Sequence, residues 1–161
     1  MTMGKATAIF GAGCFWGVEA FFERFEGITH TRVGYTGGHT AHPSYEQVKT
    51  GTTGHAEAIR IEYDPEVITY GGLVNIFFEC HDPTSRNKQG IDVGHQYRSA
   101  IFYGTEGEKA IAEEKIQQWT NKGVFKRPIV TEVTEAGTFY EAEEYHQKYS
   151  QKNGSFACGI S

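Results

Sequence analysis

The sequence lacks the long apolar run that a membrane-spanning helix needs. No stretch of its 161 residues approaches the roughly 18 consecutive apolar residues of such a helix. Residues 1–8 lack the charged and apolar regions of a signal peptide. Lysine and arginine are not clustered and the formal net charge is −5, so a nucleic-acid-binding surface is not indicated. We therefore expect a cytoplasmic protein that binds neither membranes nor nucleic acid.

Cysteine is scarce, and its spacing argues against two common roles. Cys14, Cys80 and Cys158 are odd in number and far apart, which argues against a framework of structural disulfides. The sequence has no C-x-x-C pair, so a zinc ribbon is not indicated, and its scattered histidines lack the spacing of a metal site. We predict no bound metal, and each thiol needs its own explanation.

The residues that are present fit one globular domain. Apolar residues make up 39% of the chain, an ordinary share for a folded protein, and 161 residues are enough for a hydrophobic core. The sequence has no internal repeat, linker or low-complexity tract. We predict a monomer with a single catalytic domain over residues 1–161, in which a tail from about residue 150 to residue 161 is flexible.

Hydrophobic periodicity predicts strands that alternate with helices. A long loop is expected over residues 82–97, and loops of this length inside compact domains are often functional. The element order predicts an α+β fold (an α/β sandwich) with a mixed β-sheet, packed helices and a ferredoxin-like core. The predicted strands are 6–10, 28–35, 56–63, 99–103 and 129–135; the predicted helices are one around 18–25, 69–81, 106–122 and a helix or helical turn within 139–150.

Cys14 stands where a glycine-containing turn meets the start of a predicted helix. The first turn of a helix presents free N–H groups and the positive end of the helix dipole, which stabilise a thiolate and raise its reactivity. The alternative is an inert buried cysteine, a common state of free thiols. Phe15 and Trp16 lie off the apolar stripe of this helix, so they are candidates to line a pocket or to pack beneath the turn. Cys80 continues the stripe of the next predicted helix and is expected in the core.

The segment Gly13-Cys-Phe-Trp-Gly17 resembles the signature of the peptide methionine sulfoxide reductases of the A type. Further segments resemble that family in the same order along the chain. The ordered set spans nearly the whole sequence, so it is much more specific than one five-residue match. These segments are Gly34-Tyr-Thr-Gly-Gly38, Gly54-His-Ala-Glu57, His81-Asp-Pro-Thr84, Gly90-Ile-Asp-Val-Gly-His-Gln-Tyr-Arg-Ser99 and Glu143-Glu-Tyr-His-Gln-Lys-Tyr149.

The resemblance implies a thiol-dependent reductase that converts methionine S-sulfoxide, free or in proteins, to methionine. In this family the thiol that corresponds to Cys14 becomes a sulfenic acid as methionine leaves. The resemblance also implies that Cys158 then forms a disulfide with Cys14, which thioredoxin, or dithiothreitol in its place, reduces. It implies no other cofactor.

Glu57 corresponds to the family's acid, and strand parity supports this role. Glu57 shares one face of a predicted strand with Ile59 and Ile61, so its carboxyl group should point to the apolar side. Burial there raises the pKa of a carboxyl group, and a neutral carboxyl group can donate to the sulfoxide oxygen. The alternative is a glutamate at a strand end that is turned to solvent.

Three further polar residues are assigned by the resemblance. Tyr35 and Tyr97 correspond to phenols that hydrogen-bond the sulfoxide oxygen, a role that suits a neutral donor. Asp92 corresponds to a residue that helps to order this polar site. From the residues alone, either tyrosine could equally be a half-buried sheet tyrosine.

The resemblance also implies a substrate pocket. Phe15 and Trp16 would hold the methyl group of the substrate. His146 and Tyr149 correspond to residues near the pocket, and their spacing would place them on one face of a helix. The alternative for this pair is a surface histidine beside a packing tyrosine.

Two other functions are compatible with parts of this pattern. The first is a cysteine-nucleophile hydrolase or acyltransferase, which requires an ordered Cys–His pair beside Cys14. The second is a non-enzymatic module that binds methionine-containing peptides through Phe15 and Trp16. A test for thiol-dependent sulfoxide reduction separates both from the reductase.

Overall fold

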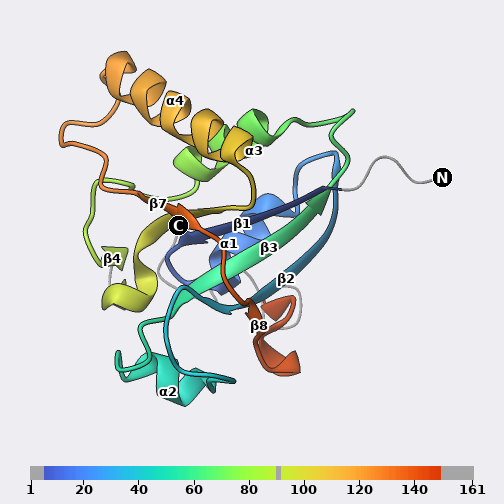
Figure 1. Ribbon diagram of the computed structural model, residues 1–161, viewed down its shortest axis with the longest axis vertical. Helices are drawn as coiled ribbons and strands as arrows, with labels where there is room; N and C mark the ends of the chain where they lie inside the picture. The colour runs from blue at the N-terminus through green and yellow to red at the C-terminus, as the bar shows by residue number, and fades with distance from the viewer. Residues whose placement is uncertain (1–5, 90–91, 150–161) are drawn as a thin grey trace.

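A six-stranded sheet forms the centre of the molecule in the computed structural model, which describes residues 6–89 and 92–149 (Figure 1). The strand order is β7-β6-β1-β3-β2-β8. Strands β6 and β7 pair parallel and the other neighbours pair antiparallel, so the sheet is mixed, as predicted. The strands are β1 (Ala6–Ala12), β2 (Ile28–Thr36), β3 (Ala56–Tyr63), β6 (Ser99–Tyr103), β7 (Glu132–Glu135) and β8 (Tyr140–Glu141).

Helices α1 (Phe15–Phe22) and α3 (Tyr70–Glu79) pack on one face of this sheet through aromatic side chains. Phe10 of β1 has ring-centroid distances of 5.8 Å to Phe22 and 5.1 Å to Phe77. Helix α4 (Glu106–Lys122) packs beside α3, and the five-residue helix α2 (Tyr45–Lys49) lies with β8 at the other end of the view in Figure 1. The α+β fold class is therefore confirmed.

The strand order bears on the predicted ferredoxin-like core. Strands β1, β2, β3 and β6, with α1 and α3 between them, follow the order β-α-β-β-α-β along the chain. In the sheet they lie as β6-β1-β3-β2, antiparallel throughout. This arrangement is the one that the prediction requires, and the ferredoxin-like assignment itself stays a prediction.

The segments around residues 82–97 and 139–150 differ from the prediction. The expected loop contains a small hairpin of β4 (Lys88–Gln89) and β5 (Asp92–Val93), followed by the 3-10 turn η1 (His95–Tyr97). The prediction is wrong where it allows a helix to begin near residue 139, because Tyr140–Glu141 pairs with β2 as the edge strand β8. The single helical turn expected in this segment is present as η2 (Glu144–His146).

Candidate active site

Cys14 lies at the junction of β1 and α1, where the sequence predicts it. Gly13 has a φ of +99°, a left-handed conformation that turns the chain out of β1 and that glycine adopts without strain. Cys14 is the N-cap residue of α1, and its carbonyl oxygen accepts a hydrogen bond from Val18 N–H at 3.3 Å. The residue is 5% exposed, so its thiol lies below the surface, at the positive end of the helix dipole.

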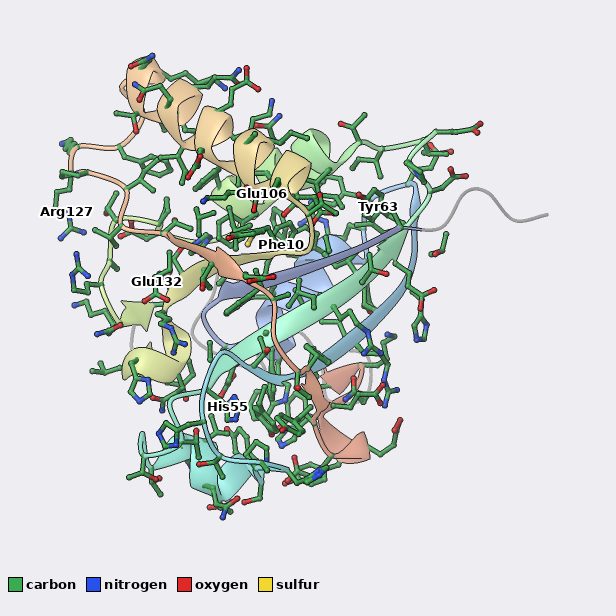
Figure 2. The ribbon with its side chains drawn as sticks, in the orientation of Figure 1. Phe10, His55, Tyr63, Glu106, Arg127 and Glu132 are labelled. Atoms are coloured by element: carbon green, nitrogen blue, oxygen red, sulfur yellow. The ribbon has the colours of Figure 1, made fainter. Side chains whose placement is uncertain are left out.

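Glu57 of β3 lies directly beside the start of α1. Its Oε1 accepts a hydrogen bond of 3.1 Å from the backbone N–H of Phe15, the residue after Cys14. Glu57 is 1% exposed and faces the helices together with Ile59 and Ile61, as strand parity predicts. Figure 2 locates this end of β3, because it labels His55, two residues before Glu57, near α2 and β8. The thiol and the carboxyl group therefore share one helix start.

Tyr97, from η1, is the second polar group at this place. The residue is 9% exposed. Burial raises the pKa of its phenol, and the nearby negative charges of Glu57, Asp92 and Cys14 raise it further. The pKa of the Tyr97 phenol therefore responds to all three groups. The phenol is protonated at neutral pH and available as a donor.

Tyr45, the first residue of α2, joins the site without having been predicted. Burial raises the pKa of its phenol, and the charges of Glu57, Cys14 and Asp92 contribute to the rise, together with Tyr97. Its ring lies 6.4 Å from the Phe15 ring, centroid to centroid. Tyr45 is therefore a second phenol that is protonated at neutral pH and whose pKa responds to the charges of the thiol and the carboxyl group.

Tyr35, on β2, has a hydroxyl group that already has a protein partner. Its side chain is fully buried on β2, opposite Glu57 across the β2–β3 ladder. Its hydroxyl group donates a hydrogen bond of 2.9 Å to Oε1 of Glu143. Burial raises the pKa of this phenol, so the donor proton stays in place and is committed to the Glu143 carboxylate.

An aromatic cluster adjoins the start of α1. The Trp16 ring is stacked on Tyr149 at a centroid distance of 3.9 Å and an interplanar angle of 12°. His146 is 1% exposed and packs against the rings of Phe15, Trp16 and Tyr45 at 5.4, 5.5 and 4.3 Å. The structure thus brings together the four residues predicted to bind substrate, Phe15, Trp16, His146 and Tyr149.

A hydrogen bond fixes the orientation of Trp16 and the tautomer of His146. The indole Nε1–H donates to His146 Nδ1 at 2.9 Å. An indole nitrogen can only donate, so Nδ1 carries no proton and the neutral imidazole is protonated on Nε2. Burial lowers the pKa of His146, which favours this neutral form.

Comparison with known proteins identifies the family of this site. A family model described as "Peptide methionine sulfoxide reductase" matches residues 6–161. The peptide methionine sulfoxide reductase MsrA of Methanothermobacter thermautotrophicus is 52% identical over 151 residues, which cover 94% of this chain and 89% of that protein. The chain belongs to the peptide methionine sulfoxide reductase family.

Solved structures of this family agree with the fold. Mxr1 from Saccharomyces cerevisiae in its reduced form matches with a TM-score of 0.91 and 34% identity, covering 97% of this chain and 90% of that one. Methionine sulfoxide reductase A of Corynebacterium diphtheriae matches with a TM-score of 0.82 and 35% identity, covering 99% of this chain and 84% of that one. Together with the sequence relatives, they place this member of the family in the A type.

Three residues singled out from the sequence remain, and each has a different outcome. Asp92 lies on β5, partly buried, within electrostatic range of Tyr97 and Tyr45. Cys80 is 5% exposed and its Sγ–H donates to the Phe77 carbonyl oxygen at 3.2 Å, so its place in the core is confirmed. Cys158 lies outside the described residues.

Two features of other protein classes are absent from the described residues. Within residues 6–89 and 92–149, no three His, Cys, Asp or Glu side chains gather as a metal site would require. In the same part of the chain, no helix has both the length and the apolar character needed to cross a membrane.

Sequence reasoning missed Tyr45 and Glu143 as contributors to the site. A signal existed for Tyr45, because Ser44 and Gln47 form a capping box that marks the start of α2. The helix is too short to show a hydrophobic period, so this signal stood alone. Glu143 is part of the family-like segment near the end of the chain, and its contacts with Tyr35 and Tyr45 are visible only in three dimensions.

Proposed function

We propose that Cys14 is the nucleophile and Glu57 the acid with which this chain reduces methionine S-sulfoxide, free or within proteins. The enzyme class follows from family membership: the chain is a thiol-dependent peptide methionine sulfoxide reductase. The single observation that supports the residue assignment is the hydrogen bond from Phe15 N–H to Glu57 Oε1. It holds a buried carboxyl group beside the helix start that carries the thiol.

The first step transfers one oxygen atom. The Cys14 thiolate attacks the sulfoxide sulfur while Glu57 donates a proton to the sulfoxide oxygen. The attack joins the two sulfur atoms. The protonated oxygen then shifts to the Cys14 sulfur, as the substrate's sulfur–oxygen bond and the new sulfur–sulfur bond both break. Methionine leaves and Cys14 remains as a sulfenic acid, so the substrate sulfur is reduced and the cysteine sulfur is oxidised by two electrons.

The hydroxyl groups of Tyr97 and Tyr45 stabilise the oxygen during this transfer. Both phenols have a raised pKa because they are buried near negative charge, so both remain protonated donors at neutral pH. We assign the second phenolic role to Tyr45 rather than Tyr35, since the Tyr35 hydroxyl already donates to Glu143. Asp92 orders this polar group through its charge near both phenols.

The aromatic cluster supplies the site for the substrate's methyl group. Phe15 and Trp16 follow Cys14 directly in the chain, so an apolar group bound against them lies next to the thiol. His146 fixes the indole by its Nδ1 and Tyr149 covers one face of it. We propose that the four side chains select a methyl sulfoxide over a charged or bulkier group.

Cys158 completes the cycle in this proposal. Its thiol attacks the Cys14 sulfenic acid, which releases water and forms the Cys14–Cys158 disulfide. The two thiols of reduced thioredoxin then reduce this disulfide by exchange and become oxidised themselves. Mxr1 from Saccharomyces cerevisiae has been solved in complex with Trx2, which supports a thioredoxin as the protein partner.

The cycle uses thiols alone. We therefore propose that thioredoxin, or dithiothreitol in the laboratory, is the reductant and that no bound cofactor takes part. A monomer is sufficient, because every residue assigned above belongs to one chain. A cytoplasmic location also stays a prediction, supported by the need for reduced thiols, which that compartment maintains.

Assays on separated sulfoxide epimers test the assignment of Cys14 and Glu57. With dithiothreitol, the parent enzyme should reduce the S epimer and leave the R epimer unchanged. Cys14→Ser should abolish the reaction, and Glu57→Gln should slow it by about a hundredfold or more, the usual contribution of a general acid. Cys80→Ala serves as the matched control because Cys80 is buried in the core. Full activity of Cys14→Ser would exclude the mechanism.

The same preparations separate the two other functions. A cysteine hydrolase would cleave a chromogenic ester or amide and consume no reductant. A binding module would retain methionine-peptide binding in Cys14→Ser and would also consume none. Stoichiometric formation of methionine and oxidised dithiothreitol by the parent enzyme is expected, and it contradicts both.

The resolving thiol has its own test. Cys158→Ser should form one methionine per enzyme at the parent's rate and then stall with thioredoxin as the reductant. Equal steady-state rates for this variant and the parent would remove Cys158 from the cycle, while the assignment of Cys14 would stand.

A further inference from the structure

Glu143 connects parts of the chain that are far apart in the sequence. Its Oε1 accepts a hydrogen bond of 2.9 Å from the Tyr35 hydroxyl, on β2. Its Oε2 accepts one of 3.0 Å from the backbone N–H of Tyr45, at the start of α2. The side chain is 35% exposed, so the contacts lie at the boundary of the core. One carboxylate thereby ties α2 to the central sheet.

This tie determines where the Tyr45 ring lies. Helix α2 has five residues, and a helix of this length has almost no stability by itself. The N–H groups of its first turn have no partner within the helix. Ser44 accepts the N–H of Gln47, and Glu143 accepts the N–H of Tyr45. Without Glu143, the first residue of α2 loses its link to β2.

The same carboxylate faces His146. The neutral His146 ring is protonated on Nε2, because Nδ1 accepts from Trp16. This Nε2 is buried without a hydrogen-bond partner among the described residues, and it lies 3.8 Å from Oε1 of Glu143. A negative charge at that distance favours the proton on Nε2 over Nδ1. Glu143 therefore also stabilises the tautomer that orients Trp16.

Glu143 is charged at neutral pH. Burial by itself would raise the pKa of its carboxyl group. Hydrogen bonds from the backbone N–H groups of Tyr45 and of Glu143 itself, and from the Tyr35 hydroxyl, outweigh burial and lower this pKa below its usual value. Donors that point at a carboxylate favour its ionised form.

We propose that Glu143 is a positioning residue for sulfoxide reduction, which holds Tyr45 and Trp16 against the Cys14 pocket without touching the substrate. This inference rests on the proposed roles of Cys14 and Tyr45. A residue that merely supported the fold would change stability, and its loss would slow the reaction equally with or without the Tyr45 hydroxyl. A positioning residue is coupled to that hydroxyl.

The first measurement is the single-turnover rate of methionine formation at saturating S-sulfoxide. We expect Glu143→Ala to slow this rate by about tenfold or more, since displacement of a catalytic group by about 1 Å is enough for such a loss. The matched control is Glu144→Gln, the next carboxylate in the chain, whose side chain is 75% exposed and pairs with Arg32. It should stay within about twofold of the parent.

Glu143→Gln separates hydrogen bonding from charge. Its amide oxygen can accept the Tyr45 N–H and its NH₂ group can donate to the Tyr35 oxygen, so both ties persist. The NH₂ group would then face the Nε2–H of His146, donor against donor, and the negative charge would be gone. We expect a loss of about threefold to fivefold, between the control and Glu143→Ala. A rate equal to that of the parent in both Glu143 variants overturns the proposal.

The decisive measurement repeats Glu143→Ala in a Tyr45→Phe background. With the phenolic hydroxyl already absent, only the contribution through His146 and Trp16 remains, so the further loss should fall from about tenfold or more to about threefold to fivefold. An equal loss in the two backgrounds overturns the proposal and leaves the proposed function intact. If Tyr45→Phe reacts like the parent, the role of Tyr45 and this proposal both fail, whereas Cys14 and Glu57 keep theirs. If Glu143→Ala does not fold, Glu143→Asp, whose shorter side chain cannot reach both the Tyr35 hydroxyl and the Tyr45 N–H, is taken through the same comparison, with a smaller loss of the same pattern.

Discussion

Tyr35 and Tyr45 show how the partner of a side chain decides its role. Both are tyrosines with a raised pKa, and the Glu57 charge contributes to both rises. The Tyr35 hydroxyl donates to Glu143, and we propose that it serves as a structural donor. The pKa of the Tyr45 phenol responds to the charges of both Glu57 and Cys14, and we propose that its hydroxyl group acts on the sulfoxide oxygen. Motif position favoured Tyr35, and only the three-dimensional contacts distinguish the two.

This difference predicts that Tyr35→Phe and Tyr45→Phe have opposite effects on the free energy of unfolding and on the single-turnover rate. Tyr35→Phe should lower the free energy of unfolding by roughly 1–3 kcal/mol, the usual cost of losing a hydrogen bond to a charged group. It should lower the single-turnover rate by less than about threefold. Tyr45→Phe should do the reverse, with a loss of rate of about tenfold or more and little change in stability. Urea unfolding and rapid-quench kinetics on both variants check this, and a larger kinetic loss in Tyr35→Phe would contradict it.

His81 gives a pH dependence of stability at the same scale. Its Nδ1 donates to the Phe77 carbonyl oxygen at 2.8 Å and its Nε2 accepts from the Ser99 hydroxyl at 2.7 Å. Burial lowers the pKa of this imidazole from 6.5 to about 4. The unfolded chain therefore takes up a proton before the folded chain does, so stability falls as pH decreases from about 6.5 to about 4.

We expect His81 to contribute at most about 2 kcal/mol of this loss between pH 7.5 and pH 5. Urea unfolding of the parent at both pH values measures the total. The matched variant is His81→Gln, whose amide can make both hydrogen bonds and does not titrate in this range. Its stability should fall by correspondingly less, and an identical fall in both proteins would contradict the assignment.

At the scale of elements, local pattern predicted the regular segments well. The predicted ranges 56–63, 99–103 and 106–122 are those of β3, β6 and α4. In β3, alternating side chains face two different environments, and in α4 a threonine cap and Gly123 at φ +70° mark the two ends. Such signals are local, so a sequence contains them.

The missed elements depend on distant partners. Strand β8 exists because Tyr140 and Glu141 pair with the open edge of β2, over 100 residues away in the chain. Helix α2 is held by Glu143, 98 residues further along the chain. Cys14 and Glu57 were predicted because a helix start and strand parity are local features. Tyr45 and Glu143 were not, because their contacts are long-range.

Gln147 makes a contact of this kind that mutation can measure. Its Oε1 accepts the N–H of Val33 at 2.9 Å, and its Nε2 donates to the Val33 carbonyl oxygen at 2.9 Å. The amide thus acts as one further strand residue at the edge of β2, and it is 2% exposed. Gln147→Glu loses the donor and places a carboxylate against a carbonyl group.

We expect Gln147→Glu to lower the free energy of unfolding by about 2–3 kcal/mol at neutral pH, since the Val33 and Ala142 carbonyl oxygens each lose the donor that Gln147 supplies and a charge is buried. Gln118→Glu is the matched control on the exposed side of α4 and should change stability by less than about 0.5 kcal/mol. Urea unfolding at pH 7.5 compares the two, and equal stabilities would show that the β2 edge does not need this amide.

At the scale of the whole molecule, the end of the described chain is fastened to the helix that carries the thiol. Glu19 of α1 is 1% exposed, and its carboxylate accepts the backbone N–H of Lys148 at 2.8 Å and the Lys148 Nζ at 2.9 Å. Next in the chain, Tyr149 stacks on Trp16. The segment that leads to Cys158 therefore starts from a fixed point on α1.

Two truncations test whether this fixed point belongs to the first step of the reaction or to its recycling. A chain that ends at Tyr149 keeps every contact described above but lacks Cys158. It should form one methionine per enzyme at the parent's rate, fail to cycle with thioredoxin, and cycle with dithiothreitol. A chain that ends at Ala142 also loses Glu143 and the partners of Trp16 and Glu19. It should lose at least about 3 kcal/mol of stability, because several buried polar groups lose their partners at once. It should also lose most of the rate of the first step.

Quenched-flow methionine assays and urea unfolding compare the two truncated chains. A first step that fails already in the chain ending at Tyr149 would mean that residues 150–161 take part in sulfoxide reduction itself, and the division between reduction and recycling would have to be redrawn.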